Sequence, residues 1–213
     1  MTAATERSLV VVSAGLSQPS STRLLADRLS VATDRHLRDA GIEPTVEVIE
    51  LRDHAQDLTN HLLTGFPSPT LQTAIDSVVA ADGLIAATPI FSGSYSSLFK
   101  MFFDVLERDG LAGRPVLLAA TGGSARHSLA LDHAMRPLFA YFNAAVVPTA
   151  VYAASEDWGG VAGVADGRLV QRIDRAGREL ASAMAARTAQ PRRDPYADPI
   201  PFEQLLRGNV QPD

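Results

Sequence analysis

The chain of 213 residues contains no cysteine. Without a thiol it can form no disulfide, thiolate nucleophile, Cys-ligated zinc site or iron–sulfur cluster, which excludes thiol-dependent phosphatases and thioredoxin-like proteins. Aromatic residues are scarce at 6%, but hydrophobic residues make up 46% of the chain and suffice for a sizeable core. The composition therefore excludes wholesale disorder and predicts one globular α/β domain.

An excess of positive charge is also absent, because 19 Lys and Arg stand against 24 Asp and Glu and leave a net charge of −5. This balance argues against binding to nucleic acid or to an anionic membrane surface. The apolar run after residue 7 is too short for a signal-peptide core and far short of the roughly 20 residues that cross a bilayer. We therefore expect a cytoplasmic protein, with no nucleic acid and no membrane among its partners.

Apolar runs alternate with helical patterns along the chain. Strands are predicted at residues 8–13, 45–51, 83–88 (ending at Pro89), 114–121 and 145–152. Helices are predicted from an N-cap at residues 20–22 to Gly41, and over residues 98–106, 124–142 and 166–187. Residues 52–69 form a long excursion between two strands, with no helix or strand assigned to it. Five strands interleaved with helices predict a doubly wound α/β sheet of five parallel strands with helices on both faces.

The end of the chain differs in composition from the rest. Five of the thirteen prolines follow residue 190, so no regular helix or central strand can run through this part. We assign residues 1–189 to a single domain and residues 190–213 to a Pro-rich C-terminal arm. Phe202, Leu205 and Leu206 make this arm apolar enough to dock, either on a neighbouring subunit or on its own domain.

Three loops follow predicted strands at the edge where open α/β sheets bind ligands. The first, residues 13–23, leads into a helix whose free N–H groups and nearby hydroxyls suit a phosphate. It lacks the spacing of a dinucleotide-binding loop or a P-loop, and simple helix capping would also explain its hydroxyls. The second and third, residues 88–97 and 121–127, combine small residues with donors that can approach a flat ligand closely. Their alternative role is that of tight turns whose aromatic residues cover the core.

The residues that several other kinds of chemistry require are absent from the sequence. A phosphoacceptor receiver domain needs acidic residues where this chain has Ser13 and Thr88. No G-x-S-x-G nucleophile elbow is present, and the five histidines show no metal-ligand spacing, so we predict neither a metal site nor a catalytic side chain.

At these loops the chain resembles the flavodoxin-like NAD(P)H-dependent FMN reductases, in particular those that supply reduced FMN to luciferase-like two-component monooxygenases. The resemblance spans roughly residues 8–152. In that family an S-x-G-x-x-x-P-S-x-T loop holds the FMN phosphate, a T-P-[IV]-[YF]-x-G-S-Y loop lies along the isoalloxazine, and a T-G-G-S segment lies near the pyrimidine edge and the nicotinamide cleft. The resemblance implies a strand order of 2-1-3-4-5. It also implies these cofactor-binding residues: Ser13, Gly15, Ser17, Gln18, Ser20, Ser21, Thr22, Pro89, Ile90, Phe91, Ser92, Gly93, Ser94, Tyr95, Thr121, Gly122, Gly123, Ser124, Arg126 and His127.

The chain departs from the family at several positions. Gln18 stands where relatives often carry Arg, so the helix dipole, the hydroxyls and Arg23 would balance the phosphate charge. Phe91 replaces a frequent Tyr. Relatives carry a π-bulge at a position that looks like His133, at the subunit interface. Pro137 independently predicts an irregularity there, because it cannot donate a hydrogen bond to the His133 carbonyl, and we favour a plain proline kink over a bulge.

The function implied by the resemblance is NAD(P)H:FMN oxidoreduction, with hydride transfer to flavin N5 and release of reduced FMN to a monooxygenase partner. Arg126 would contact the phosphates of NADPH or NADH, although a solvated arginine at a helix start is the simpler alternative. The resemblance also implies a homodimer or homotetramer. Two other functions stay open: an FMN-bound reductase of quinones, azo dyes or metal ions, and a flavodoxin-type electron carrier.

Overall fold

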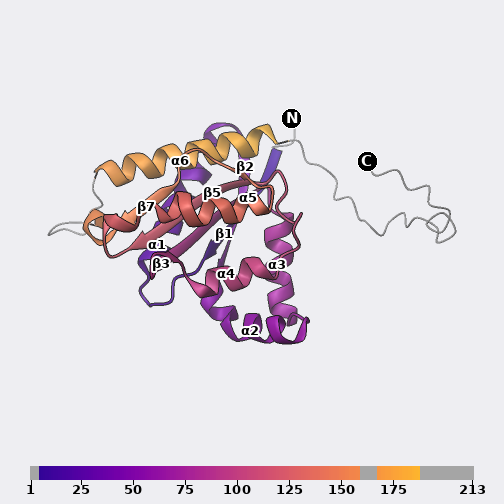
Figure 1. The fold of residues 1–213 in the computed structure, drawn as a ribbon. Helices are drawn as coiled ribbons and strands as arrows, with labels where there is room; N and C mark the ends of the chain where they lie inside the picture. Colours follow the sequence, from indigo (N-terminus) through magenta and orange to yellow (C-terminus); the bar gives the residue numbers. More distant parts are fainter. Residues whose placement is uncertain (1–4, 159–166, 188–213) are drawn as a thin grey trace, which may run out of the picture.

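The computed structural model describes residues 5–158 and 167–187. Strands and helices alternate along the described residues, and the last described element is a long helix packed over the sheet (Figure 1). The elements are β1 (Thr5–Ser13), α1 (Ser21–Asp39), β2 (Ile42–Glu50), the 3₁₀ helix η1 (Leu51–His54), α2 (Ala55–Thr64), α3 (Pro69–Ala80), β3 (Gly83–Phe91), β4 (Ser94–Tyr95), α4 (Ser97–Asp104), β5 (Pro115–Gly122), the 3₁₀ helix η2 (Ala125–His127), the π-helix η3 (Leu131–Met135), α5 (Arg136–Tyr141), β6 (Ala145–Val146), β7 (Val151–Ala154), the 3₁₀ helix η4 (Ser155–Trp158) and α6 (Gly167–Ala186).

The sheet has the predicted parallel, doubly wound topology. Its order is β2-β1-β3-β5, with β6 and β7 both pairing parallel to β5 and β4 pairing antiparallel to β3. The expected 2-1-3-4-5 order is thus confirmed, with one difference at its last position. There the fifth strand, predicted as continuous over residues 145–152, is two short strands. Pro148 lies between them and lacks the amide proton that an unbroken ladder would need.

Helices cover both faces of the sheet, and each face has its own apolar core. Along β1, Leu9 and Val11 pack with α1 and α6, whereas Val10 and Val12 pack with the helices of the opposite face, as the two-residue period of a strand requires. Both sets are buried, which explains why the strand is an unbroken apolar run. Within the described residues, no helix combines the length and the apolar character needed to span a membrane.

The long excursion over residues 52–69, to which no helix was assigned, is occupied mostly by η1 and α2, and α3 begins at its end. Helix α2 ends at Gly65, whose φ of 80° is the left-handed conformation that favours glycine. Of its ten residues only Leu58 is buried, so the helix lies on the surface and leaves little apolar periodicity in the sequence.

The predicted helix over residues 124–142 is also wrong in part. The segment contains the 3₁₀ helix η2, the π-helix η3 and only then the α-helix α5. The expected proline kink is instead a π-bulge: the Arg136 N–H reaches back five residues to the Leu131 carbonyl. Pro137 follows in the first turn of α5, directly after the bulge.

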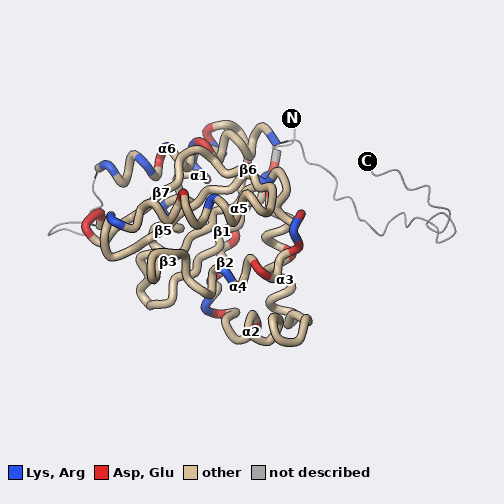
Figure 2. Tube along the Cα trace, in the orientation of Figure 1, with Lys and Arg blue, Asp and Glu red and all other residues tan. Residues whose placement is uncertain are grey.

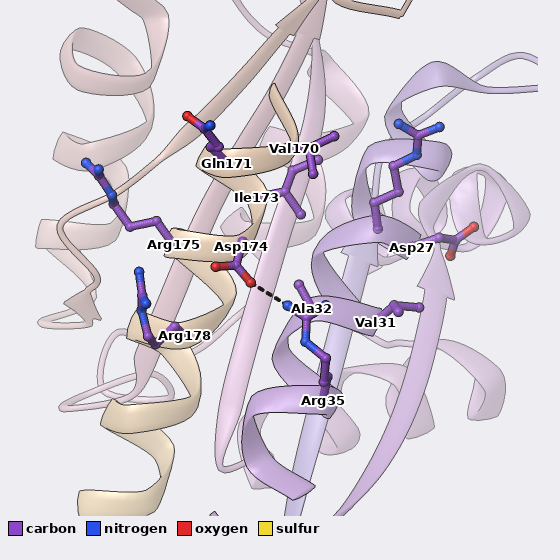
Figure 3. Close-up of a pocket in the computed structure, with 11 residues that line it drawn as sticks. Asp27, Val31, Ala32, Arg35, Val170, Gln171, Ile173, Asp174, Arg175 and Arg178 are labelled. Carbon is purple, nitrogen blue, oxygen red and sulfur yellow. Dashed lines mark hydrogen bonds and ion pairs between the residues drawn. The ribbon is translucent and has the colours of Figure 1, made fainter. Parts of the chain in front are cut away.

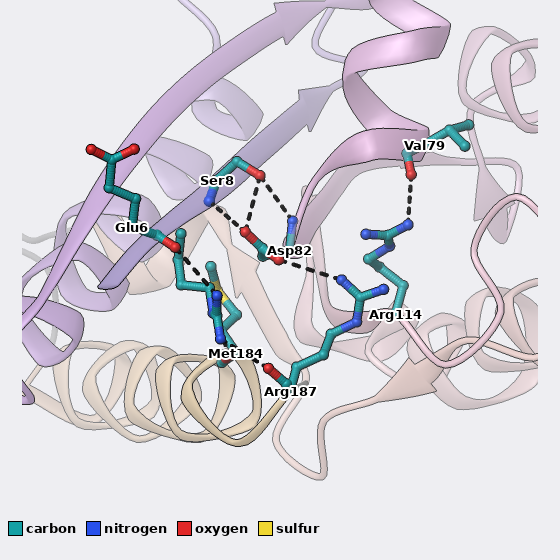
Figure 4. Close-up of polar contacts among 8 residues, drawn as sticks. Glu6, Ser8, Val79, Asp82, Arg114, Met184 and Arg187 are labelled. Carbon is teal, nitrogen blue, oxygen red and sulfur yellow. Dashed lines mark hydrogen bonds and ion pairs between the residues drawn. The ribbon is translucent and has the colours of Figure 1, made fainter. Parts of the chain in front are cut away.

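A polar cluster fixes the end of α6 at the amino-terminal edge of the sheet (Figure 4). The Arg7 guanidinium donates to the carbonyls of Met184 and Arg187 at 3.0 and 2.9 Å. Arg187 in turn lies 3.4 Å from Asp82, whose carboxylate accepts from the Ser8 amide at 2.9 Å. The last described turn of the chain is therefore tied to β1 and to the start of β3. The residues assigned to the C-terminal arm follow it, outside the described residues.

Candidate flavin site

Three strands end together at the carboxyl edge of the sheet. Ser13 at the end of β1 pairs with Ala87 of β3, and Thr88 pairs with Ala120 of β5. The chain leaves β1 toward β2 on one side and β3 toward β5 on the other, so the strand order reverses between β1 and β3. The structure therefore brings the first, second and third predicted loops to one edge, at the topological position where open α/β sheets bind ligands.

The first loop forms a cradle in front of α1. Ser20 is the N-cap of this helix, and its hydroxyl accepts from the Arg23 amide at 3.2 Å. Gly15 faces that hydroxyl: a Cβ at position 15 would lie 2.0 Å from Ser20 Oγ and 3.4 Å from Thr22 Cβ. A side chain at position 15 would therefore displace the Ser20 hydroxyl from the position in which it caps the helix.

The donor set of this cradle fits the phosphate of FMN. A 19-residue helix directs its free N–H groups and positive dipole end toward the loop. Ser20 lies at its start, Ser17 and Ser21 are exposed, and the fully buried Ser13 hydroxyl has no hydrogen-bond partner in the described structure. An anion bound here would meet donors that the protein itself leaves unused.

The charge beside the loop comes from a residue that the sequence analysis did not single out. Arg52 of η1 donates to the Ser17 carbonyl at 3.3 Å. With the Gln18 amide oriented so that its oxygen faces this guanidinium, Arg52 Nη1 is 2.9 Å from that oxygen. Arg23, which the sequence analysis considered for this role, is instead bonded to Asp27 and Glu50. Arg52 thus places a cation against the first loop, although it is itself paired with Glu50 and Asp53.

The second loop is a β-hairpin. Strand β3 does not end at Pro89 as predicted but continues to Phe91. The pairing of β3 with β1 stops at Ala87. Pro89, which has no amide proton, is therefore tolerated beyond this point. Ser92 and Gly93 both have positive φ, 50° and 83°, as in a type I′ hairpin turn.

This hairpin presents an aromatic side chain at the edge of the sheet. Phe91 is 51% exposed at the tip and pairs with Ser94, while Ile90 is buried and pairs with Tyr95. The Tyr95 ring packs against Phe99 of α4, 5.7 Å between centroids. Phe91 is thus free to lie against a flat ligand, whereas Tyr95 is partly committed to the core.

The third loop is fixed to its surroundings by two contacts. The Thr121 hydroxyl is 2.7 Å from that of Thr22, which joins the end of β5 to the start of α1. Tyr152 of β7 donates to the Ser124 carbonyl at 2.8 Å. Burial, assisted by the nearby Asp157 carboxylate, raises the pKa of Tyr152 above its ordinary value, so the phenol stays protonated and donating. Gly122 leaves room for this phenol, since a Cβ there would lie 2.2 Å from the Tyr152 oxygen.

Arg126 and His127 lie in η2, which forms the end of this loop, and both are exposed. The structure therefore places every predicted site residue on the three converging loops. Two side chains that contact these loops, Arg52 and Tyr152, were not predicted, because each comes close to a loop only through tertiary packing. The tyrosine lies within a predicted strand, but nothing in the sequence indicates which loop it contacts.

The Thr22–Thr121 pair gives a prediction on stability. Changing either residue alone to Val should lower the free energy of unfolding by about 1–3 kcal/mol, because the other hydroxyl then stays buried without a partner. The double variant T22V/T121V should lose less than the sum of the two single changes. Denaturant unfolding measures these values, with the exposed Thr59→Val as a control that should stay within about 0.5 kcal/mol of wild type. Strict additivity of the two changes would contradict the link.

Comparison with known proteins agrees with this architecture. Residues 8–159 match the family of NADPH-dependent FMN reductases. An FMN reductase (NADPH) of Pseudomonas aeruginosa is 40% identical over 150 residues, 70% of this chain and 78% of the relative. The NADH-dependent FMN reductase SfnF of Pseudomonas fluorescens has the same identity and coverage.

Solved structures give the same result. An oxidoreductase from Corynebacterium diphtheriae superposes with a TM-score of 0.81 at 47% identity, covering 86% of this chain and 99% of that one. An NADH:FMN oxidoreductase (EmoB), solved in its apo form, superposes with a TM-score of 0.72 at 28% identity, covering 87% and 92%. The chain belongs to the NADPH-dependent FMN reductase family. It is accordingly an NAD(P)H:FMN oxidoreductase with FMN and NAD(P)H as its cofactors, which confirms the resemblance seen in the sequence.

Proposed function

We propose that the enzyme uses FMN as an exchangeable substrate at the three converging loops and releases the reduced flavin to a flavin-dependent monooxygenase. The observation that carries this proposal is the convergence of the Gly15 cradle, the Phe91 hairpin and the Thr121 turn at one edge of the sheet. Each loop alone would be an ordinary turn, but together they suit a flat ring with an anionic tail.

Exchange is supported by the exposure of the loops. In the first loop residues 16–19 are exposed, and in the hairpin residues 91–93 are exposed as well. A ligand held mainly on such surfaces keeps contact with solvent and can leave without a large rearrangement.

The local charges support the same conclusion. Arg23 and Arg52 are each paired with carboxylates, those of Asp27, Glu50 and Asp53. These two cations and three anions sum to a net charge of −1, so a phosphate meets no net positive charge from this group. Binding would therefore depend mainly on the helix start and the hydroxyls, with a smaller contribution from Arg52, and would be weaker than binding by a free arginine pair.

When bound, FMN supplies the ring that accepts hydride from NAD(P)H, so no side chain needs to act as acid, base or nucleophile. The protein would bind and orient the reactants. Hydroxyls and N–H groups of the first loop would hold the phosphate, and Phe91 and the hairpin backbone would lie along the ring. Thr121 to Ser124 would border the cleft for the nicotinamide, with Arg126 toward the dinucleotide phosphates.

One assay tests this function. Purified protein is mixed with NADPH or NADH, and loss of nicotinamide absorbance is followed with and without added FMN. We expect oxidation that requires added FMN. Light emission from a luciferase-like monooxygenase added to the mixture then checks whether reduced FMN leaves the enzyme.

The other outcomes assign other functions. Turnover without added FMN would indicate a bound-flavin reductase of quinones, azo dyes or metal ions. A yellow protein that does not react with either nucleotide would indicate an electron carrier. A colourless protein that neither binds FMN nor oxidises NAD(P)H would overturn the proposal. For the assembly we propose a cytoplasmic homodimer or homotetramer, which sedimentation of the purified protein would test.

A further inference from the structure

A long groove lies on the outer side of the α1/α6 layer, away from the flavin loops (Figure 3). Its volume is about 820 Å³. Two valines, Val31 of α1 and Val170 of α6, line it and are 67% and 51% exposed. Its floor is formed where the helices touch: a Cβ on Gly177 would lie 2.8 Å from Ala32 Cβ. We call this feature the α1/α6 groove.

The rim of the α1/α6 groove is predominantly basic. Basic residues recur along α6 (Figure 2). Four arginines and two aspartates line the groove: Arg28, Arg35, Arg175, Arg178, Asp27 and Asp174. Asp174 is already bonded to Arg35 and lies 2.9 Å from His36 Nε2, which leaves Asp27 as the other acidic group. An apolar floor with a net positive rim suits an apolar segment that carries carboxylates.

The groove leads toward the point where the described chain ends. A second hollow continues it along the same two helices, sharing Arg178 and reaching Ala185 and Ala186 in the last turn of α6. The contacts of Arg7 and Arg187 fix this last turn against the sheet. The chain beyond residue 187 therefore starts from a fixed position at one end of the groove.

The sequence that follows has the matching chemistry. Residues 194–206 contain Asp194, Asp198 and Glu203 but no Lys or Arg. The same stretch contains a set of apolar side chains: Tyr196, Ile200, Phe202, Leu205 and Leu206. Prolines at several positions favour an extended conformation, which loses little backbone entropy on binding in a groove.

The tether is long enough. From Ala186 back to Val170 the groove follows sixteen residues of helix, about 24 Å. Positions 188 and 202 are fourteen residue steps apart, which corresponds to about 43 Å when the chain is extended. A tether of this kind also gives an effective concentration on the order of millimolar, far above that of a second molecule in solution.

We propose that residues 194–206 of the same chain occupy the α1/α6 groove. Their apolar side chains cover Val31 and Val170, and their carboxylates face the arginines of the rim. The arm is then a strap across the layer of helices that lies away from the flavin loops.

Because the chain contains no cysteine, the proposal can be tested in the full-length protein with introduced cysteine pairs. A short bismaleimide, whose span tolerates small errors in register, is added to V31C/F202C and to V31C/L206C. The control Q56C/F202C places the first cysteine on exposed α2, on the other face of the sheet. We expect intrachain cross-linking in at least one Val31 pair to be more than about tenfold faster than in the control. Charge reversal with R175E/R178E should slow it.

Equal rates in the test pairs and the control would overturn the proposal. Cross-linked dimers on a denaturing gel would also overturn it, because the groove would then hold the arm of another copy. Hydrogen exchange needs no introduced cysteine, so it tests the proposal even if the cysteine variants misfold. Hydrogen exchange around Val31 and Val170 should be faster in full-length F202S/L205S/L206S than in wild type, and unchanged exchange there would contradict the assignment.

Discussion

Gly15→Ala is expected to weaken FMN binding by about a hundredfold, or about 2.7 kcal/mol. The new Cβ would lie 2.0 Å from Ser20 Oγ, so the Ser20 hydroxyl has to leave its capping position or the loop has to move. Either movement separates the hydroxyls from the N–H groups of α1 that together form the phosphate cradle. Quenching of FMN fluorescence on titration with protein measures the dissociation constant. In the NADPH assay the same change should raise KM for FMN more than it lowers kcat.

Two further variants separate this cause from general damage. Gly167→Ala at the start of α6 meets nothing within 4 Å and should bind FMN as wild type does. Removing the obstructing side chain with Ser20→Gly weakens the helix cap, but G15A/S20G should bind no worse than S20G alone, because the clash is gone. If G15A bound FMN with unchanged affinity, the first loop would not be the phosphate site.

Arg52→Ala is expected to raise the dissociation constant for FMN about tenfold and to leave that for riboflavin unchanged. Arg52 is the cation in contact with the first loop, through the Ser17 carbonyl and the Gln18 amide. Riboflavin lacks the phosphate, so only FMN should lose the charge-assisted interaction. Titrations at two salt concentrations would add a second test, because the salt dependence of FMN binding should also decrease.

Arg38→Ala is the matched control for this change. Arg38 is likewise a paired arginine, bonded to Asp34 and Glu43, but it lies at the other end of α1. Its removal should leave both flavins unaffected. An equal loss of FMN and riboflavin affinity in R52A would instead mean that Arg52 only supports the shape of the loop.

The strands at the centre of the sheet were predictable because their environment is simple. β1, β3 and β5 are covered on both faces, so burial requires nearly continuous apolar runs, and residues 8–13, 83–88 and 114–121 show them. Both ends of α1 were predictable as well. Ser20 caps the start of the helix, and Gly41, with a φ of 76°, follows its end.

Surface helices and tertiary contacts were harder to predict from the sequence. Helix α3 had a usable signal that the sequence analysis left unassigned: Ser68 as N-cap, Pro69 in the first turn and buried Leu71 and Val78 on one face. Pro137 indicates that helical geometry fails nearby, but not that the failure is a π-bulge, which depends on how the neighbouring turns pack.

The candidate site likewise has one part that was predictable from the sequence and one part that was not. Its loops follow from motifs, whereas the contact of Thr22 with Thr121 joins residues 99 positions apart, which one sequence does not reveal.

The contact between Arg7 and Arg187 has a practical consequence for engineering. It brings the first strand and the final helix together at the amino-terminal edge of the sheet, while the flavin loops lie at the carboxyl edge. A linker joining residue 7 to residue 187 would therefore need to be only a few residues long. Circular permutants opened at an exposed turn far from the flavin loops, such as the one around Gly65, should retain reductase activity.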